Sequence, residues 1–372
     1  MGRIKVLEVI DGGFLGGGQT NILSIIRNID RNKFDVHVAA MGGGKFENEV
    51  NKCDIPFYAV ELPKVLRHRF LKKLGEIQNR ERFEIVHSHG GVGGFYGRLL
   101  RKHDGNIKSV HTIHGIHYLN SDNVLIRNVS KSIEQYLVQF TDRTVCENQT
   151  DFKTAIENKI ADENKTVVIN NGVNIFKFAN LKKNLDLIKR FGLDEKNFIV
   201  GNVSRFDVQK NQSLIIQASY YLIKKFPEMR FILAGGGKLL KKMKDYAMDS
   251  NLENYVLFAG ERENIEDYYS IFDIIVLPSL WEGMSIVLLE SMASRLPIIC
   301  SNIPCNLEVI KNNYSALTVN PHEADDLITK ISILYNNKEL REKLVQNALI
   351  EVTQYDEGEM TRKIEAVYQE AV

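Results

Sequence analysis

Residues 274–293, IIVLPSLWEGMSIVLLESMA, predict a strand, a turn and a helix in immediate succession. The apolar run Ile274–Leu277 has the composition of a buried strand, and Pro278 and Gly283 break the chain after it. The following run, Ser285–Ala293, has the composition of a helix. Strand, loop and helix in this order are typical of an α/β protein with a parallel sheet.

Two carboxylates flank this turn, Glu282 in the loop and Glu290 on the helix. The backbone N–H groups of Gly283, Met284 and Ser285 are predicted at the start of the helix, where unpaired donors and the helix dipole favour an anion such as a diphosphate. Carboxylates only accept hydrogen bonds, which suits sugar hydroxyls. The segment therefore predicts a sugar-nucleotide site, although an ordinary loop-to-helix junction with two solvated glutamates is equally consistent with this sequence.

Length and composition indicate a soluble protein of two domains. The chain has 372 residues, of which 44% are hydrophobic and 26% charged, and its net charge is +1, which argues against bulk nucleic-acid binding. The sequence has no signal-peptide layout and no apolar run of roughly 18 residues. We expect a cytoplasmic protein that can lie at the inner face of the membrane. No disulfide is expected from the four cysteines, Cys53, Cys146, Cys300 and Cys305.

Short apolar runs alternate with amphipathic segments along the whole chain, which predicts two doubly wound α/β halves facing each other across a cleft. We expect an N-terminal Rossmann-like domain over 1–175, a second over 176–356, and a C-terminal helix over 357–372 that crosses back to the first domain. The predicted strands are Ile4–Ile10, Phe34–Ala40, Ile85–His89, Ser109–Ile113, Arg143–Cys146, Thr166–Ile169, Phe198–Val203, Arg230–Ala234, Val256–Ala259, Ile274–Leu277 and Ile298–Cys300.

Glycine-rich loops follow several of these strands. The loop Gly12–Thr20, which includes Gly16, Gly17 and Gly18, precedes a helix predicted over 21–27 and lets the backbone approach a phosphate closely. A second glycine run, 42–44, and a third, 235–237, repeat the arrangement. An NAD-binding fingerprint is disfavoured, because the acidic residue expected after the second strand is replaced by Val38-Ala39-Ala40-Met41.

Cationic and histidine side chains follow other strands. Arg205 and Lys210 lie in the loop after Phe198–Val203, where they could neutralise a leaving diphosphate without a metal. Six of the nine histidines fall between His87 and His117, but their spacing fits no zinc signature and no acidic or cysteine co-ligands cluster near them in the sequence. We therefore expect no metal. His114, at the end of Ser109–Ile113, is positioned to bond a sugar hydroxyl, unless it is a structural histidine.

Taken together, these pieces resemble the retaining glycosyltransferases of family 4, which have the GT-B fold, and the resemblance covers nearly the whole chain. The matching residues are Gly16-Gly17-Gly18, Val110–Gly115, Asn171-Gly172-Val173, Arg205 with Lys210, Ala234–Gly237, Gly260-Glu261-Arg262, and Glu282 with Glu290. The departure is mild, at Met284 and Ser285, where many members carry other residues, and it leaves the choice of donor open.

The resemblance implies a role for each of these positions. Glu290 would hold the ribose hydroxyls, Glu282 the sugar hydroxyls, and Arg205 and Lys210 the diphosphate. His114 would touch the transferred sugar near its C6 hydroxyl. The remaining donor contacts would come from Gly16, Gly17 and Gly18 on the β-phosphate, Glu261 and Arg262 near the base, and Gly236, Gly283, Met284 and Ser285. By the same resemblance, Glu282 would join His114, Arg205 and Lys210 as the catalytic residues.

The implied reaction moves a hexose or N-acetylhexosamine from a nucleotide diphosphate sugar, with a UDP-sugar as the first choice, to a saccharide or lipid-linked saccharide of a cell-surface polysaccharide. The departing phosphate would take the acceptor proton, and no cofactor or metal would be required. The basic and apolar segment 64–74 could rest on anionic lipid, although a solvated helix is the slightly favoured interpretation. A nucleotide-sugar epimerase of the same fold and a non-catalytic sugar-nucleotide-binding protein stay open as alternatives.

Overall fold

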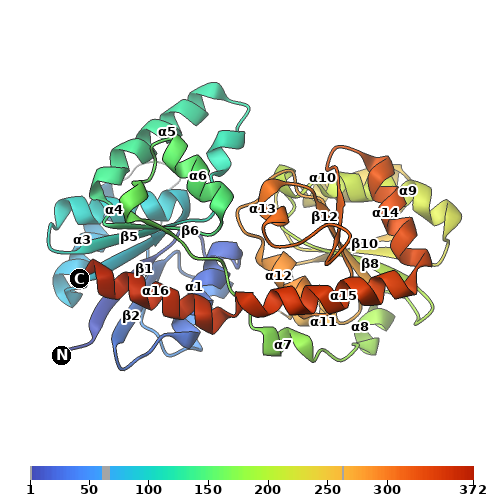
Figure 1. The fold of residues 1–372 in the computed structure, drawn as a ribbon, viewed down its shortest axis with the longest axis horizontal. Coiled ribbons are helices and arrows are strands. Elements are labelled where there is room, and N and C mark those ends of the chain that lie inside the picture. Colours follow the sequence, from blue (N-terminus) through green and yellow to red (C-terminus); the bar gives the residue numbers. More distant parts are fainter. Residues whose placement is uncertain (1, 61–67, 262–263) are drawn as a thin grey trace. The chain divides into compact units, whose positions relative to one another are not determined.

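The computed structural model describes residues 2–60, 68–261 and 264–372 (Figure 1). The chain divides into two compact units. Unit 1 comprises residues 1–172 together with 357–372, and unit 2 comprises residues 173–356. The predicted donor residue Arg262 and residues 64–67 of the basic segment lie outside the described residues.

Unit 1 is built on a seven-stranded parallel sheet in the order β3-β2-β1-β4-β5-β6-β7. The order runs one way from β1 to β3 and the other way from β4 to β7, so the sheet has a topological switch point between β1 and β4. Ligands of such sheets bind at the carboxyl ends of the strands beside this point. The strands are β1 (Ile4–Val9), β2 (Phe34–Ala40), β3 (Phe57–Ala59), β4 (Ile85–His89), β5 (Lys108–Ile113), β6 (Arg143–Cys146) and β7 (Thr166–Val168).

Helices cover both faces of this sheet, because its strands point apolar side chains to both sides. Val6 and Val38 belong to one buried cluster, whereas Leu7 and Ala39 belong to another. The last helix of the chain packs against the first, and its Tyr368 is fully buried. The helices are α1 (Gly17–Asn28), α2 (Lys45–Asn51), α3 (His68–Glu81), α4 (Gly90–His103), α5 (Val124–Leu137), α6 (Gln149–Glu157) and α16 (Glu357–Ala371).

Unit 2 repeats the scheme with a six-stranded parallel sheet in the order β10-β9-β8-β11-β12-β13, whose switch point lies between β8 and β11. The strands are β8 (Phe198–Val203), β9 (Met229–Ala234), β10 (Val256–Gly260), β11 (Ile274–Leu277), β12 (Ile298–Ser301) and β13 (Leu317–Val319). The helices are α7 (Ile175–Ala179), α8 (Leu185–Arg190), α9 (Gln212–Lys225), α10 (Leu240–Asp249), α11 (Ile265–Tyr269), α12 (Ile286–Ala293), α13 (Pro304–Leu307), α14 (Ala324–Asn336) and α15 (Lys338–Val352).

The predicted fold class, α/β with two parallel sheets, is confirmed, and all eleven predicted strands are present within one or two residues at each end. Two strands were not predicted, β3 and β13. Each has only three residues, which gives a weak pattern, although β7 of the same length was predicted. The prediction for the first helix was also wrong at its start, because α1 begins at Gly17, so Gly17 and Gly18 form its first turn.

The four cysteines are free thiols. Burial raises the pKa of both Cys146 and Cys300 to about 12, so these two stay protonated at neutral pH. None of the helices in the described parts of the chain is long and apolar enough to cross a bilayer.

Candidate functional site

In unit 2, the predicted site residues gather at the carboxyl ends of β8, β9, β10 and β11. The loops after β8 and β11 flank the switch point of the sheet, and they are tied together by backbone and side-chain hydrogen bonds. The N–H of Leu280 donates to the carbonyl of Gln209 (2.8 Å), and the amide of Asn211 donates to the carbonyl of Pro278 (3.2 Å). The two loops therefore form one continuous edge.

Lys210 and Glu282 form an ion pair across this edge. The Lys210 Nζ lies 2.5 Å from Glu282 Oε1, and the side chains are 19% and 9% exposed. The amide of Gln209 donates to Glu282 Oε2 (3.2 Å) and to the carbonyl of Trp281 (2.9 Å). The two predicted catalytic residues are thus direct partners, and Gln209 fixes the orientation of the carboxylate.

Arg205 is placed differently from Lys210. Its side chain is 53% exposed, and its ion pair with Asp207 is long, at 3.9 Å. Because a weakly held guanidinium at the surface keeps its hydration and its freedom to rotate, Arg205 can turn toward an incoming anion at low cost.

Glu290 lies on α12 and accepts a hydrogen bond from the hydroxyl of Tyr269, with 2.6 Å between Tyr269 Oη and Glu290 Oε2. Burial raises the pKa of Glu290 to about 7, and the hydrogen bond from Tyr269 only partly offsets this effect. The protonated form of the carboxyl group is therefore populated near neutral pH, and in that form it can donate a hydrogen bond to a hydroxyl as well as accept one.

The third glycine loop packs against the loop after β8. The N–H of Phe206 donates to the carbonyl of Gly236 (2.7 Å), and Gly235 has a φ of +141°. A Cβ at Gly235 would lie 2.0 Å from the carbonyl oxygen of Ser204, and a Cβ at Gly236 would lie 2.5 Å from Glu261. Only glycine allows this approach, which brings the exposed Glu261 beside the loop.

The residues before α12 have distinct environments. Met284 is buried in the core of unit 2, so its side chain faces the core. Ser285 is the N-cap of α12, and its hydroxyl accepts a hydrogen bond from the N–H of Leu288 (3.3 Å). Gly283 is buried at the turn between Glu282 and Met284.

In unit 1, the first glycine loop meets the predicted histidine. Gly16 is the N-cap of α1, without a side-chain cap, and the first turn of the helix has no acidic residue. A Cβ at Gly18 would lie 2.9 Å from Ile10 Cδ1 and 3.3 Å from His114 Cδ2, whereas a Cβ at Gly17 would meet nothing within 4 Å. The start of α1, with its positive dipole end, therefore sits directly against the His114 ring.

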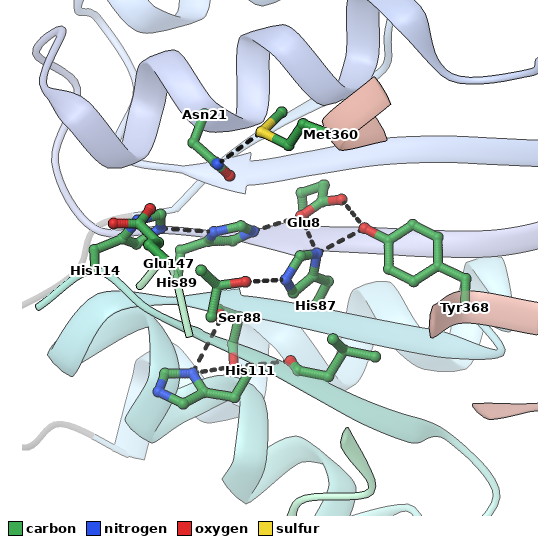
Figure 2. Close-up of polar contacts among 12 residues, drawn as sticks. Glu8, Asn21, His87, Ser88, His89, His111, His114, Glu147, Met360 and Tyr368 are labelled. Carbon is green, nitrogen blue, oxygen red and sulfur yellow. Dashed lines mark hydrogen bonds and ion pairs between the residues drawn. The ribbon is translucent and has the colours of Figure 1, made fainter. Parts of the chain in front are cut away.

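His114 belongs to a chain of hydrogen bonds that enters the core of unit 1 (Figure 2). Its Nδ1 lies 2.5 Å from Glu147 Oε1, and its Nε2 lies 2.9 Å from His89 Nδ1. His89 Nε2 in turn lies 2.7 Å from Glu8 Oε2. Both ring nitrogens of His114 thus have partners inside the protein, which differs from the expectation that one of them bonds a sugar hydroxyl.

The buried end of the chain is closed by Tyr368 of α16. Its hydroxyl lies 2.5 Å from Glu8 Oε1 and 2.6 Å from His87 Nδ1, while His87 Nε2 lies 2.7 Å from the hydroxyl of Thr112. Burial alone would raise the pKa of Glu8, but the contacts with His87 and His89 outweigh it and lower the pKa. Burial lowers the pKa of His89 to about 3.

The expectation that no acidic residue lies near the histidines was wrong, because Glu8 is brought to them by β1. Among the described residues, Glu8, His87 and His89 are the one group whose possible ligand atoms lie within 4.8 Å of one another, close enough for a metal ion. Each of those atoms already takes part in a hydrogen bond. We therefore assign the group to the hydrogen-bond network.

Sequence reasoning missed four residues at these two sites: Gln209, Tyr269, Glu8 and Glu147. Gln209 stands next to Lys210, so the loop sequence contained it without a signal for its role. The other three are separated from their partners by 21 residues or more and meet them only through the strand order.

Two families match the chain in sequence, one for each part. Residues 15–176 match Glycosyltransferase Family 4, and residues 184–350 match Glycosyl transferases group 1. The chain is 28% identical over 346 residues to the UDP-Gal:alpha-D-GlcNAc-diphosphoundecaprenol alpha-1,3-galactosyltransferase of Escherichia coli, covering 91% of this chain and 89% of that protein. It is 26% identical to the putative glycosyltransferase EpsD of Bacillus subtilis, covering 90% and 89%.

Solved structures share the fold. Anabaena Alr3699/HepE in complex with UDP-glucose superposes with a TM-score of 0.86 at 19% identity, covering 99% of this chain and 100% of that one. A glycosyltransferase from Rickettsia africae gives a TM-score of 0.81 at 22% identity, covering 100% and 99%. The two sequence families and this shared architecture identify the chain as a family 4 glycosyltransferase with the GT-B fold.

Proposed function

We propose that this glycosyltransferase moves a hexose, with galactose as the first candidate, from a UDP-sugar to a lipid-linked saccharide during synthesis of a cell-surface polysaccharide. The observation that carries the proposal is the paired Lys210–Glu282 edge at the switch point of the second sheet, a fixed cation beside a carboxylate in the position where such folds bind ligands. The activity of the Escherichia coli relative, which uses a UDP-galactose donor and a diphosphoundecaprenol-linked acceptor, supports the choice of substrates.

In the proposed reaction, the bond between the anomeric carbon and the diphosphate oxygen breaks, and the acceptor hydroxyl oxygen bonds to that carbon on the same face. Lys210 gives up its contact with Glu282 and stabilises the negative charge that grows on the diphosphate, with Arg205 turning in from the surface. Glu282, released from Lys210 but held by Gln209, accepts hydrogen bonds from the sugar. The departing phosphate takes the acceptor proton, and the positive charges of Lys210 and Arg205 would take the place of a metal ion at the diphosphate.

Glu290 serves the nucleotide rather than the sugar in this proposal. Its carboxyl group keeps one oxygen on Tyr269, which leaves the other oxygen for a ribose hydroxyl. The neighbouring loops after β9 and β10, with Gly236 and Glu261, would contact the base and the phosphates.

A lipid-linked acceptor requires a surface that tolerates lipid, and the described part of the basic segment offers exposed lysines, Lys72 and Lys73, without exposed apolar side chains beside them. Phe70 and Leu74 of that segment are buried in the core of unit 1. Helix α5 is the better candidate, because the exposed apolar side chains Val124, Leu125, Ile126, Val129, Ile133 and Tyr136 gather along it. Lys102 of α4 donates to the Tyr136 hydroxyl (2.7 Å), which puts a cation beside this apolar stripe.

The activity is tested by incubating the protein with radiolabelled UDP-galactose, UDP-glucose and UDP-N-acetylglucosamine, each with a GlcNAc-diphospho-lipid of short chain. We expect transfer from one donor, retention of the anomeric configuration by NMR, and full activity in EDTA. Inversion of the anomeric carbon or loss of activity in EDTA would overturn the mechanism. A change in the sugar with donor alone would indicate an epimerase, and nucleotide binding without release would indicate a binding protein.

Replacement of Lys210 by Ala tests the proposed role of the Lys210–Glu282 ion pair. We expect kcat/KM to fall by about 10² or more, the scale of losing one charge-stabilising group. Lys224 provides the matched control, because Lys224→Ala removes the same charge from an exposed position in the last turn of α9, which leads into the start of β9 and not the carboxyl end of a strand. Turnover of Lys210→Ala within a factor of three of the control would refute the role.

The lipid surface is tested separately by sedimentation with vesicles of phosphatidylglycerol. Leu125 is 72% exposed on α5 and Ile350 is 65% exposed in unit 2. Leu125→Glu should reduce vesicle binding, whereas Ile350→Glu should not, and both should keep activity on a water-soluble acceptor. Equal binding of the two variants would refute the assignment of α5.

A further inference from the structure

We propose that the chain Glu147–His114–His89–Glu8 holds one proton more than its two neutral imidazoles supply, so that His114 acts as a fixed cation beside the start of α1. Any effect of this charge on sugar transfer rests on the proposed function. The charge itself is inferred by counting the protons that the hydrogen bonds require. The count depends only on which atoms face one another in Figure 2.

The chain has three contacts, and each joins two atoms that can accept a proton. The contacts are Glu147 Oε1 to His114 Nδ1, His114 Nε2 to His89 Nδ1, and His89 Nε2 to Glu8 Oε2. A contact of 2.5 to 2.9 Å between two lone pairs is repulsive, so each contact must contain one proton. A neutral imidazole carries one proton, and a carboxylate carries none. Two imidazoles therefore supply two protons, and the third contact requires a third.

The rest of the network closes without any additional proton. Tyr368 donates its hydroxyl proton to Glu8 Oε1, and Thr112 donates to His87 Nε2. Neutral His87 shares its Nδ1 proton between the Tyr368 oxygen (2.6 Å) and Glu8 Oε2 (3.1 Å). These three groups each use the protons they own. The extra proton thus belongs to the branch through His114.

The third proton is located at the outer end of the branch. The Glu8 carboxyl group faces three donors, the Tyr368 hydroxyl at Oε1 and both His89 Nε2 and His87 Nδ1 at Oε2, so it stays a carboxylate and accepts from all three. His89 therefore donates from Nε2 and presents a bare Nδ1 outward, and the lowered pKa values of Glu8 and His89 agree with this arrangement. His114 must then donate from Nε2 to that Nδ1. Its own Nδ1 faces the Glu147 carboxylate, and the proton between them makes His114 an imidazolium paired with Glu147.

The ionisable groups around His114 from the described elements are Glu147 after β6, His89 and His87 on β4, Glu8 on β1, and Tyr368 on α16. From α1, the ring meets Gly18, which has no charge. With both N–H groups engaged, His114 offers an anion its positive charge rather than a hydrogen bond. His89 and Glu8 are positioning residues, because they act only through His114.

Nitrogen NMR of the ¹⁵N-histidine-labelled protein without donor tests the count directly, with His114→Gln used to assign the signals. At pH 7.5 we expect both ring nitrogens of His114 to be protonated and His89 to carry its proton on Nε2 alone. A bare nitrogen on His114 would overturn the proposal. Because no substrate is present, this outcome is independent of whether the proposed transfer reaction is correct.

The variant Glu147→Gln provides the matched control, because its amide N–H₂ can donate to His114 Nδ1 and remove the need for the third proton. We expect His114 to become neutral in this variant, with its proton on Nε2, and kcat/KM to fall about 10-fold on the scale of a lost charge interaction. A His114 that stays doubly protonated in Glu147→Gln would place the third proton elsewhere and refute the assignment. A folded variant is verified by an unchanged His87 signal.

Discussion

Replacing Glu290 by Gln should make the protein more stable at high pH and leave it unchanged at low pH. Burial raises the pKa of Glu290 from 4.5 to about 7, so the folded state binds the proton more tightly than the unfolded state does. The free energy of unfolding is therefore highest below pH 4.5 and falls as the pH rises through 7. At about 1.36 kcal/mol for each pKa unit, the loss is roughly 3 kcal/mol.

The half-buried carboxylate retains part of its hydration, so this value is an upper limit. Gln has nearly the shape of the protonated acid and can still accept the hydrogen bond from Tyr269, but it never ionises. Between pH 5 and pH 8.5, the stability of Glu290→Gln relative to wild type should therefore increase by roughly 1 to 3 kcal/mol.

Urea unfolding followed by the fluorescence of Trp281 measures this difference in stability for unit 2. Trp281 is the single tryptophan of the chain and lies in unit 2, as Glu290 does. Glu342→Gln, on the exposed surface of α15, controls for loss of a carboxylate. Parallel pH profiles for Glu290→Gln and wild type would refute the reasoning, since they would mean that Glu290 is ionised at no cost. Weaker binding of UDP by Glu290→Gln at both pH values would separately support its role at the ribose.

Other predictions concern close packing and the buried network. Gly18→Ala should lower kcat/KM about 10-fold in a steady-state assay, since its Cβ would meet Ile10 and the His114 ring, whereas Gly75→Ala on α3, with open space around its Cβ, should stay near wild type. Gly235→Ala should destabilise unit 2 by about 3 kcal/mol or more in urea unfolding, because its Cβ would lie 2.0 Å from a backbone oxygen at a φ of +141°; a loss below 1 kcal/mol would contradict this. Tyr368→Phe should cost about 1 to 3 kcal/mol, seen as faster hydrogen exchange in β1, because Glu8 loses a buried donor; exchange as slow as in Tyr246→Phe, at an exposed tyrosine, would exclude that role.

The sequence was sufficient for the architecture because most of the buried parallel strands are short, largely apolar runs that alternate with longer amphipathic segments. Ile274–Leu277 and Phe34–Ala40 are examples whose bounds are as predicted. The short strand Phe57–Ala59 was not predicted, and it is defined by its pairing with the neighbouring strand β2. Local sequence cannot encode a pairing that depends on a distant partner.

The candidate site was predictable in its residues but not in its pairings. The strand-exit positions of Lys210 and Glu282 followed from the strand pattern, yet their ion pair joins residues 72 apart and depends on β8 lying beside β11. The same holds for His114, whose two partners come from β4 and from the end of β6. A sequence pattern gives the type of side chain at the end of each strand, whereas the strand order decides which of them share a hydrogen bond.

The hydrogen bond between Tyr368 and Glu8 joins residues 360 positions apart, and it has a consequence for how the protein is made. Residues 1–172 leave the ribosome long before α16 is synthesised. Until then, Glu8 and His87 in unit 1 lack their hydrogen-bond partner Tyr368. Unit 2, which is continuous from 173 to 356, has its complete sequence before unit 1 does. A truncated product that ends before residue 357 would thus combine a finished unit 2 with an incomplete histidine network, and cellular quality control would have a clear means of recognising it.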